Sequence, residues 1–238
     1  MNTKHFPYIL SLMMLSILSM HWVAAESQSF FEALLRFTGI SSTPSTQKGT
    51  SSMKAGDIWL VQTGETGPDA LRRITKDGNY RTPLWHPGGQ SILAMKDRNK
   101  LVQLNTQGSE EVQLHAFATK NIVLIGFDKS NPDRVLVQQD PLVGVLSLAS
   151  GKITPLPYDP KNVKDREALD QLNSDTRYYG NIIVSIVDQA VVDLKGRPQT
   201  TYTIKVENNV NDIAIKCPSV CSQPALSSDG RQLLFIDH

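Results

Sequence analysis

Short apolar segments alternate with polar turns from Gly56 to the end of the chain. Runs of this length, bounded by Gly, Asn, Asp and Ser, are typical of β-strands. The pattern therefore predicts an all-β domain over residues 56–238. The segments expected as strands, apart from those in the repeated motif below, are 57–62, 71–75, 100–104, 111–114, 122–127, 134–138, 144–148, 153–156, 182–187, 190–194, 200–206 and 212–216.

One motif occurs twice in this β-rich region, at residues 83–94 and 224–235. Each copy has a proline, a short apolar stretch, a tight turn with glycine at the same offset, and an apolar strand. A recurring unit of this kind indicates a repeat fold. The residues that define the two copies and their turns are Pro83, Trp85, Pro87, Gly89, Pro224, Asp229 and Gly230.

The spacing of the repeat favours a β-propeller. Trp85, Phe127, Tyr179 and Leu226 recur at intervals of roughly 40 to 50 residues, which is the period of a four-stranded blade. Residues 56–238 have room for four blades, with five short ones as the alternative. Two strands precede the first copy and two strands end the chain. We therefore expect the N- and C-terminal strands to pair in one blade and remove the exposed edges.

Residues 159–175 interrupt the strand pattern. Val163, Leu169 and Leu172 are separated by charged residues at a spacing that fits a short helix. The sequence thus predicts one helical insertion between repeats.

The N-terminal residues 1–25 have the three parts of a signal peptide. A basic start precedes an apolar run that ends with Val23, Ala24 and Ala25. A membrane anchor is the alternative, but the apolar run is shorter than the roughly 20 residues that span a bilayer. We expect cleavage after Ala25 and a periplasmic or secreted protein with no transmembrane span afterwards. Glu26 is not the cysteine that a lipid-anchored protein requires.

Residues 26–40 are predicted to form an amphipathic helix, and residues 41–55 a flexible linker. The helix either docks on its own domain or contacts a partner or membrane. A pair of tyrosines near the helical insertion is a second candidate contact, with core packing as the alternative. The candidate contact residues are Phe30, Phe31, Leu34, Phe37, Tyr178 and Tyr179.

Charge and cysteine content narrow the function classes. The formal net charge is +1 and no basic block occurs, which leaves no electrostatic basis for nucleic-acid binding. Cys217 and Cys221 are the two cysteines, and in an exported protein an even count favours a disulfide. A metal site is the alternative, but the two thiols would need further ligands.

The motif resembles the repeat of TolB-type β-propellers, which also occurs in the propeller domains of the prolyl oligopeptidase family. Residues 71–94 and 223–236 are similar to this repeat, and residues 133–156 more loosely so. The Ser-Pro-Asp-Gly turn of the family is altered in both copies, because Gly88 replaces its Asp and Ser228 replaces its Pro. The resemblance implies a propeller fold in which these residues shape turns. It implies nothing about activity.

No catalytic, cofactor or metal site is predicted. The chain has no G-x-S-x-G elbow, H-E-x-x-H helix or glycine-rich phosphate loop. Only three histidines follow the predicted signal peptide, at positions 86, 115 and 238, and a calcium loop at Asp128, Asp133 and Asp140 would lack the usual ligand density. We therefore expect a non-catalytic protein-interaction module in the cell envelope or outside the cell, of undetermined oligomeric state. The alternative is an enzyme, or a binder of a small ligand or glycan, with its site at the mouth of the central channel.

Overall fold

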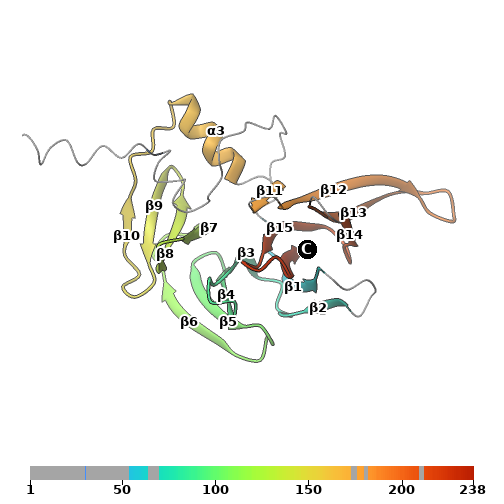
Figure 1. The fold of residues 1–238 in the computed structure, drawn as a ribbon, viewed down its shortest axis with the longest axis horizontal. Helices are drawn as coiled ribbons and strands as arrows, with labels where there is room; N and C mark the ends of the chain where they lie inside the picture. The colour runs from blue at the N-terminus through green and yellow to red at the C-terminus, as the bar shows by residue number, and fades with distance from the viewer. Residues whose placement is uncertain (1–29, 31–53, 64–69, 173–175, 180–181, 209–211) are drawn as a thin grey trace, which may run out of the picture.

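The computed structural model describes Phe30 and residues 54–63, 70–172, 176–179, 182–208 and 212–238. Sixteen strands within these residues form four antiparallel sheets of four strands each (Figure 1). The chain is therefore a four-bladed β-propeller, as the repeat predicted. The predicted signal peptide, nearly all of the predicted N-terminal helix and almost the whole linker lie outside the described residues.

Three blades are built from consecutive strands, and the fourth combines both ends of the β-domain. We name them the first, second, third and closing blades. The first comprises β3 (Tyr80–Trp85), β4 (Ser91–Lys96), β5 (Lys100–Asn105) and β6 (Glu111–Ala116). The second comprises β7 (Val123–Asp128), β8 (Asn131–Gln139), β9 (Leu142–Ser147) and β10 (Ile153–Pro155). The third comprises β11 (Thr176–Tyr179), β12 (Ile182–Val192), β13 (Pro198–Glu207) and β14 (Asp212–Lys216). The closing blade comprises β15 (Cys221–Leu226), β16 (Gln232–Asp237), β1 (Asp57–Gln62) and β2 (Leu71–Arg73).

The closing blade joins the two ends of the domain through β1 and β16. These strands pair antiparallel from Asp57 opposite Asp237 to Gln62 opposite Gln232. Successive side chains of a strand point to opposite faces, and both faces of this pair are buried: Leu234 packs toward the first blade and Phe235 toward the third. The predicted pairing of the N- and C-terminal strands is confirmed.

The described residues form four apolar clusters, and three of these lie between adjacent blades. One joins the closing and first blades and includes Trp85, whose indole N–H donates to the Ala225 carbonyl at 3.2 Å. A second cluster joins the first and second blades, and a third cluster joins the third and closing blades. The last packs the helix α3 (Val163–Leu172) and Phe30 against the second blade, with no described residue from the third blade.

The helix α3 is the predicted insertion, and it lies between the second and third blades (Figure 1). Its Leu169 is buried against Ile125, Leu136 and Val143 of the second blade. The helix therefore covers apolar surface on the side where a neighbouring blade would pack. The strand pattern predicted the helix itself but gave no sign of this packing role.

The two copies of the motif meet at the centre of the molecule. Strands β3 and β15 each carry a bulge, and the residues before the motif prolines, Thr82 and Gln223, have φ angles of 45° and 57°. The N–H of Thr82 donates to Oε1 of Gln223 at 2.5 Å, and the Thr82 hydroxyl accepts the N–H of Leu124 at 3.2 Å. These bonds link the inner strands of three blades, so the motif also connects blades.

The glycines of the two motif turns adopt the same conformation. Gly89 and Gly230 have φ angles of 70° and 72°, where a side chain would be strained. Their N–H groups donate back to the carbonyls of His86 and Ser227 at 2.8 and 3.0 Å. In the second turn, Asp229 also accepts the Ser227 hydroxyl at 2.6 Å. The common turn geometry explains why glycine recurs at this offset in the sequence.

The third blade differs from the sequence prediction. Residues 182–187 and 190–194 were expected as separate strands, but β12 runs unbroken from Ile182 to Val192. The innermost strand β11, over residues 176–179, was not predicted. Asp188 and Gln189 were interpreted as a break between strands. The actual reversal follows Val192 and contains Gly196, which has a φ of 75°.

The predicted disulfide between Cys217 and Cys221 is present. Cys217 follows β14 and Cys221 begins β15, so the bond connects the third blade to the closing blade. Both cysteines are buried in the cluster between these blades. The disulfide therefore fixes the short connection between the third blade and the closing blade.

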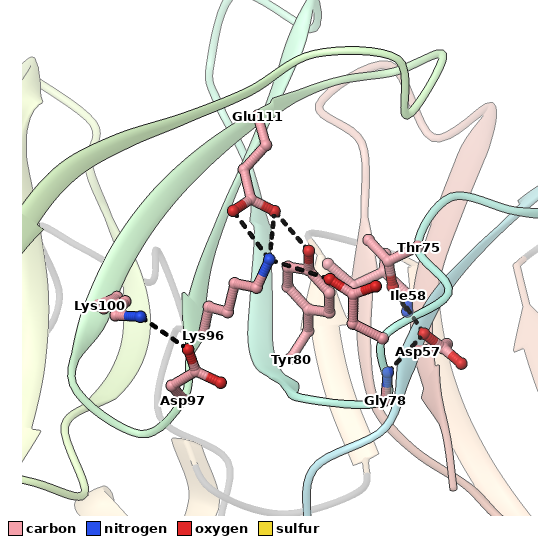
Figure 2. A network of polar contacts seen from close by, with 10 residues as sticks. Asp57, Ile58, Thr75, Gly78, Tyr80, Lys96, Asp97, Lys100 and Glu111 are labelled. Carbon is pink, nitrogen blue, oxygen red and sulfur yellow. Dashed lines mark hydrogen bonds and ion pairs between the residues drawn. The ribbon is translucent and has the colours of Figure 1, made fainter.

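A polar network covers the edge between the closing and first blades (Figure 2). Nζ of Lys96 lies 3.0 Å from carboxylate oxygens of both Asp77 and Glu111, and 5.0 Å from the centre of the Tyr80 ring. The Tyr80 hydroxyl donates to Glu111. Close by, Asp57 of β1 accepts the N–H of Gly78 at 3.0 Å. The network ties the turn before β3 to both blades.

This network should make the fold sensitive to alkali. Burial, and next the hydrogen bond to Glu111, raises the pKa of Tyr80 from 10.0 to about 12. Because the raised pKa favours the neutral phenol in the folded state, its stabilising effect is complete below pH 10 and is lost as the pH approaches 12. We expect the free energy of unfolding to fall over this range, and to fall less in Tyr80→Phe. Urea denaturation at pH 8, 10, 11 and 12 measures this, with Tyr202→Phe as a control outside the network. If the free energy of unfolding fell equally with pH in Tyr80→Phe and in the unmodified protein, Tyr80 would not be the group responsible.

The disulfide should stabilise the fold measurably. Closing so short a loop constrains the unfolded chain by about 2 kcal/mol in the chain-entropy description. We expect the double variant Cys217→Ser/Cys221→Ser to lose about this amount in urea denaturation at pH 7. A reducing agent should lower the stability of the unmodified protein and leave the double variant unchanged. Equal stabilities of the oxidised protein and the double variant would refute a stabilising role.

Candidate interaction surface

A two-stranded arm projects from the third blade (Figure 1). Strands β12 and β13 pair from Ile183 opposite Glu207 as far as Val192 opposite Pro198. Their neighbours are much shorter, because β11 reaches only Ser185 and β14 reaches only Thr203. We define the arm as residues 188–202. Among the described residues, no strand pairs with either outer edge of the arm.

The arm ends in two exposed apolar side chains. Val192 is 70% exposed, and Leu194 in the turn is fully exposed. Asp188, Gln189 and Ala190 on the same strand are exposed as well. A single exposed apolar residue is ordinary on a protein surface. Two of them at the end of a hairpin with two unpaired edges form a feature that suits contact with another molecule.

The turn that presents Leu194 is held by Asp193. Its carboxylate accepts the N–H groups of Lys195 and Arg197 at 2.8 and 2.9 Å, and Nε of Arg197 at 2.8 Å. The N–H of Gly196 donates to the Asp193 carbonyl at 2.9 Å. These bonds, above all the backbone N–H of Arg197, hold the pKa of Asp193 below its ordinary value. The tip is therefore ordered before any partner binds, which reduces the entropy lost on contact.

The base of the arm is attached to the rigid part of the molecule. Ile186 and Tyr202 pack against the cluster between the third and closing blades. The N–H of Cys217 donates to the Tyr202 carbonyl at 2.9 Å, beside the disulfide. The arm thus has a fixed origin, while its outer part has exposed side chains and unpaired edges.

Two of the six residues predicted as partner contacts, Phe30 and Tyr179, pack against other parts of the molecule. Phe30 is 2% exposed, and its ring centre lies 4.9 Å from that of Tyr158. Tyr179 is half-buried against the closing blade; its hydroxyl donates to the Pro224 carbonyl at 3.4 Å, and burial raises its pKa. Phe31, Leu34 and Phe37 lie outside the described residues, as does the side chain of Tyr178. For these four the prediction stays untested.

A cavity of about 240 Å³ lies between the first and second blades and is lined by His86, Ser91 and Asp133 among others. These are the residue types of a catalytic triad, which requires hydrogen bonds between its members. Here the Ser91 hydroxyl accepts a hydrogen bond from Nε2 of Gln103 at 2.8 Å, and Nδ1 of His86 accepts one from the N–H of Gly88 at 3.2 Å. The cavity therefore lacks the bonded arrangement by which a histidine activates a serine.

Within the part of the chain that the structure describes, no three His, Cys, Asp or Glu residues gather closely enough to hold a metal ion. The described helical segments also include none with the length and apolar character needed to cross a membrane.

Two solved structures show distant similarity to this chain. The tricorn protease is 12% identical, with 82% of this chain and 20% of the protease covered and a TM-score of 0.35. The β-propeller domain of Cps50 (Swd1) from Myceliophteria thermophila is 13% identical, with 79% of this chain and 64% of that domain covered and a TM-score of 0.30. No protein-family model and no curated protein matches the sequence. The chain thus spans about a fifth of the protease and less than two thirds of the Cps50 domain, and the propeller assignment rests on its own four sheets.

Proposed function

We propose that this chain is an exported, non-catalytic β-propeller of the TolB-repeat type that binds a protein partner in the cell envelope or outside the cell. The arm over residues 188–202 is the docking element, and its structure is the observation that carries the proposal. It combines an ordered tip, exposed apolar side chains and unpaired strand edges on a rigid base.

The chemistry of the arm indicates how a partner would bind. An unpaired strand edge offers N–H and C=O groups to an extended segment of another chain, as in β-augmentation. Val192 and Leu194 would then fill apolar pockets at the end of the contact. Two acids, Asp188 and Asp193, balance two bases, Lys195 and Arg197. The arm is therefore suited to a partner that offers an apolar pocket and an extended strand rather than a charged surface.

Two features support export. Residues 1–25 have the composition of a cleaved signal peptide. The disulfide between Cys217 and Cys221 would persist in an oxidising compartment and would be reduced in most cytosols. A periplasmic or extracellular location brings these two observations together.

Partner binding should depend on the tip of the arm. A charged residue at position 194 would have to enter an apolar pocket. Replacing one of the few residues that dominate an interface weakens binding by about fivefold or more. We expect Leu194→Asp to reduce co-purification of the partner from envelope and culture fractions of the source cells by at least about fivefold. The matched control is Leu142→Asp, because Leu142 is 54% exposed on the second blade, away from the arm.

A photo-crosslinking amino acid identifies the contact directly. Placed at position 194, it should form a covalent adduct with the same protein, and placed at position 142 it should not. Equal recovery of the partner with Leu194→Asp and Leu142→Asp, together with no adduct from position 194, would overturn the arm as the docking element.

A further inference from the structure

A second cavity, of about 280 Å³, opens between the inner strands of the first and second blades. Arg81 and Thr82 of β3 form one side of it. Asn121, just before β7, and Gln138 and Asp140 form the other. The lining therefore comes from separate parts of the sequence, which meet only because the two blades pack together.

Arg81 is the cationic group in the wall of this cavity. Its Nε is buried and has no hydrogen-bond partner among the described residues. Burial, and next the nearby charge of Arg98, lowers the pKa of Arg81. A buried donor without a partner is costly, and such a group in a native structure calls for an explanation. A rotation of the guanidinium toward the cavity would let an acceptor supplied by a ligand satisfy this donor.

The backbone of the cavity wall is held in an unusual conformation. Thr82 has a φ of 45° and Asn121 a φ of 66°, and positive φ at a β-branched residue is rare. Asn121 donates its N–H to the Arg98 carbonyl at 3.1 Å, while Thr82 is bonded to Gln223 and Leu124. Residues held in such conformations by their surroundings cluster at ligand sites. The wall is therefore preorganised around Arg81.

The charges around the cavity fit one kind of ligand. Arg81 and nearby Arg98 supply two positive charges, and Asp140 supplies one negative charge in the lining. The excess of one positive charge suits a ligand that carries one negative charge. Asp140 would repel a phosphate dianion. A guanidinium matches the planar geometry of a carboxylate.

We propose that this cavity is a binding site for a carboxylate group. The carboxylate belongs either to a small organic acid or to an acidic side chain of a bound polypeptide. The site is separate from the arm and does not depend on the partner proposed for it.

Calorimetric titration of the full chain with three probes tests the proposal: glutarate, the capped peptide acetyl-Ala-Asp-Ala-amide, and inorganic phosphate. We expect saturable binding of at least one carboxylate probe and weaker binding of phosphate. Arg81→Gln should weaken carboxylate binding at least tenfold, since it removes a charge-assisted hydrogen bond. Arg231→Gln, on the exposed turn before β16, should leave the affinity unchanged.

Asp140→Asn gives an independent readout through increased binding. It removes the negative charge from the lining, and we expect it to raise the affinity for phosphate relative to glutarate. Near-ultraviolet circular dichroism confirms that each variant is folded. Tighter binding of the peptide than of glutarate would identify a polypeptide side chain as the source, and the reverse would identify a small acid. Absence of carboxylate binding, a preference for phosphate in the unmodified protein, or full binding by folded Arg81→Gln would overturn the proposal.

Discussion

The pairing of β1 with β16 holds the two ends of the propeller together. Each blade needs four strands, and the closing blade obtains them from segments at opposite ends of the β-domain. Ile58 and Leu234 are buried toward the first blade, while Val61 and Phe235 are buried toward the third. Separating the two strands would therefore open two of the apolar clusters at once and expose two strand edges. The hydrogen bonds from Gln223 through Thr82 to Leu124 carry the same constraint across the inner strands.

Because these contacts tie the blades together, elements that project from the blades are held at fixed positions. The arm projects from a base that the disulfide and Tyr202 attach to the closing blade. The cavity at Arg81 exists only while the first and second blades remain packed. The helix α3 lies between the second and third blades, and its Leu169 packs against the second blade. The residues proposed to bind other molecules are thus mostly different from those that pack the blades together.

The sequence was sufficient for the architecture because the repeat encodes it locally. Gly89 and Gly230 mark turns that require positive φ, and the strand count at each end of the domain predicted the shared blade. The arm was missed because Asp188 and Gln189 resemble a break, whereas the pairing of β12 with β13 continues past them. The cavity had no sequence signal at all. Arg81, Asn121 and Asp140 are far apart in the chain, and only blade packing places them together.

Native-state hydrogen exchange followed by mass spectrometry tests the shared blade most directly. Amides of β1 and β16 should exchange together, as slowly as those of the central strands of the first blade. Peptides from residues 188–202 should exchange much faster, because their outer edges are unpaired. Rapid exchange of β1 while β16 stays protected would show that the two ends do not form one blade.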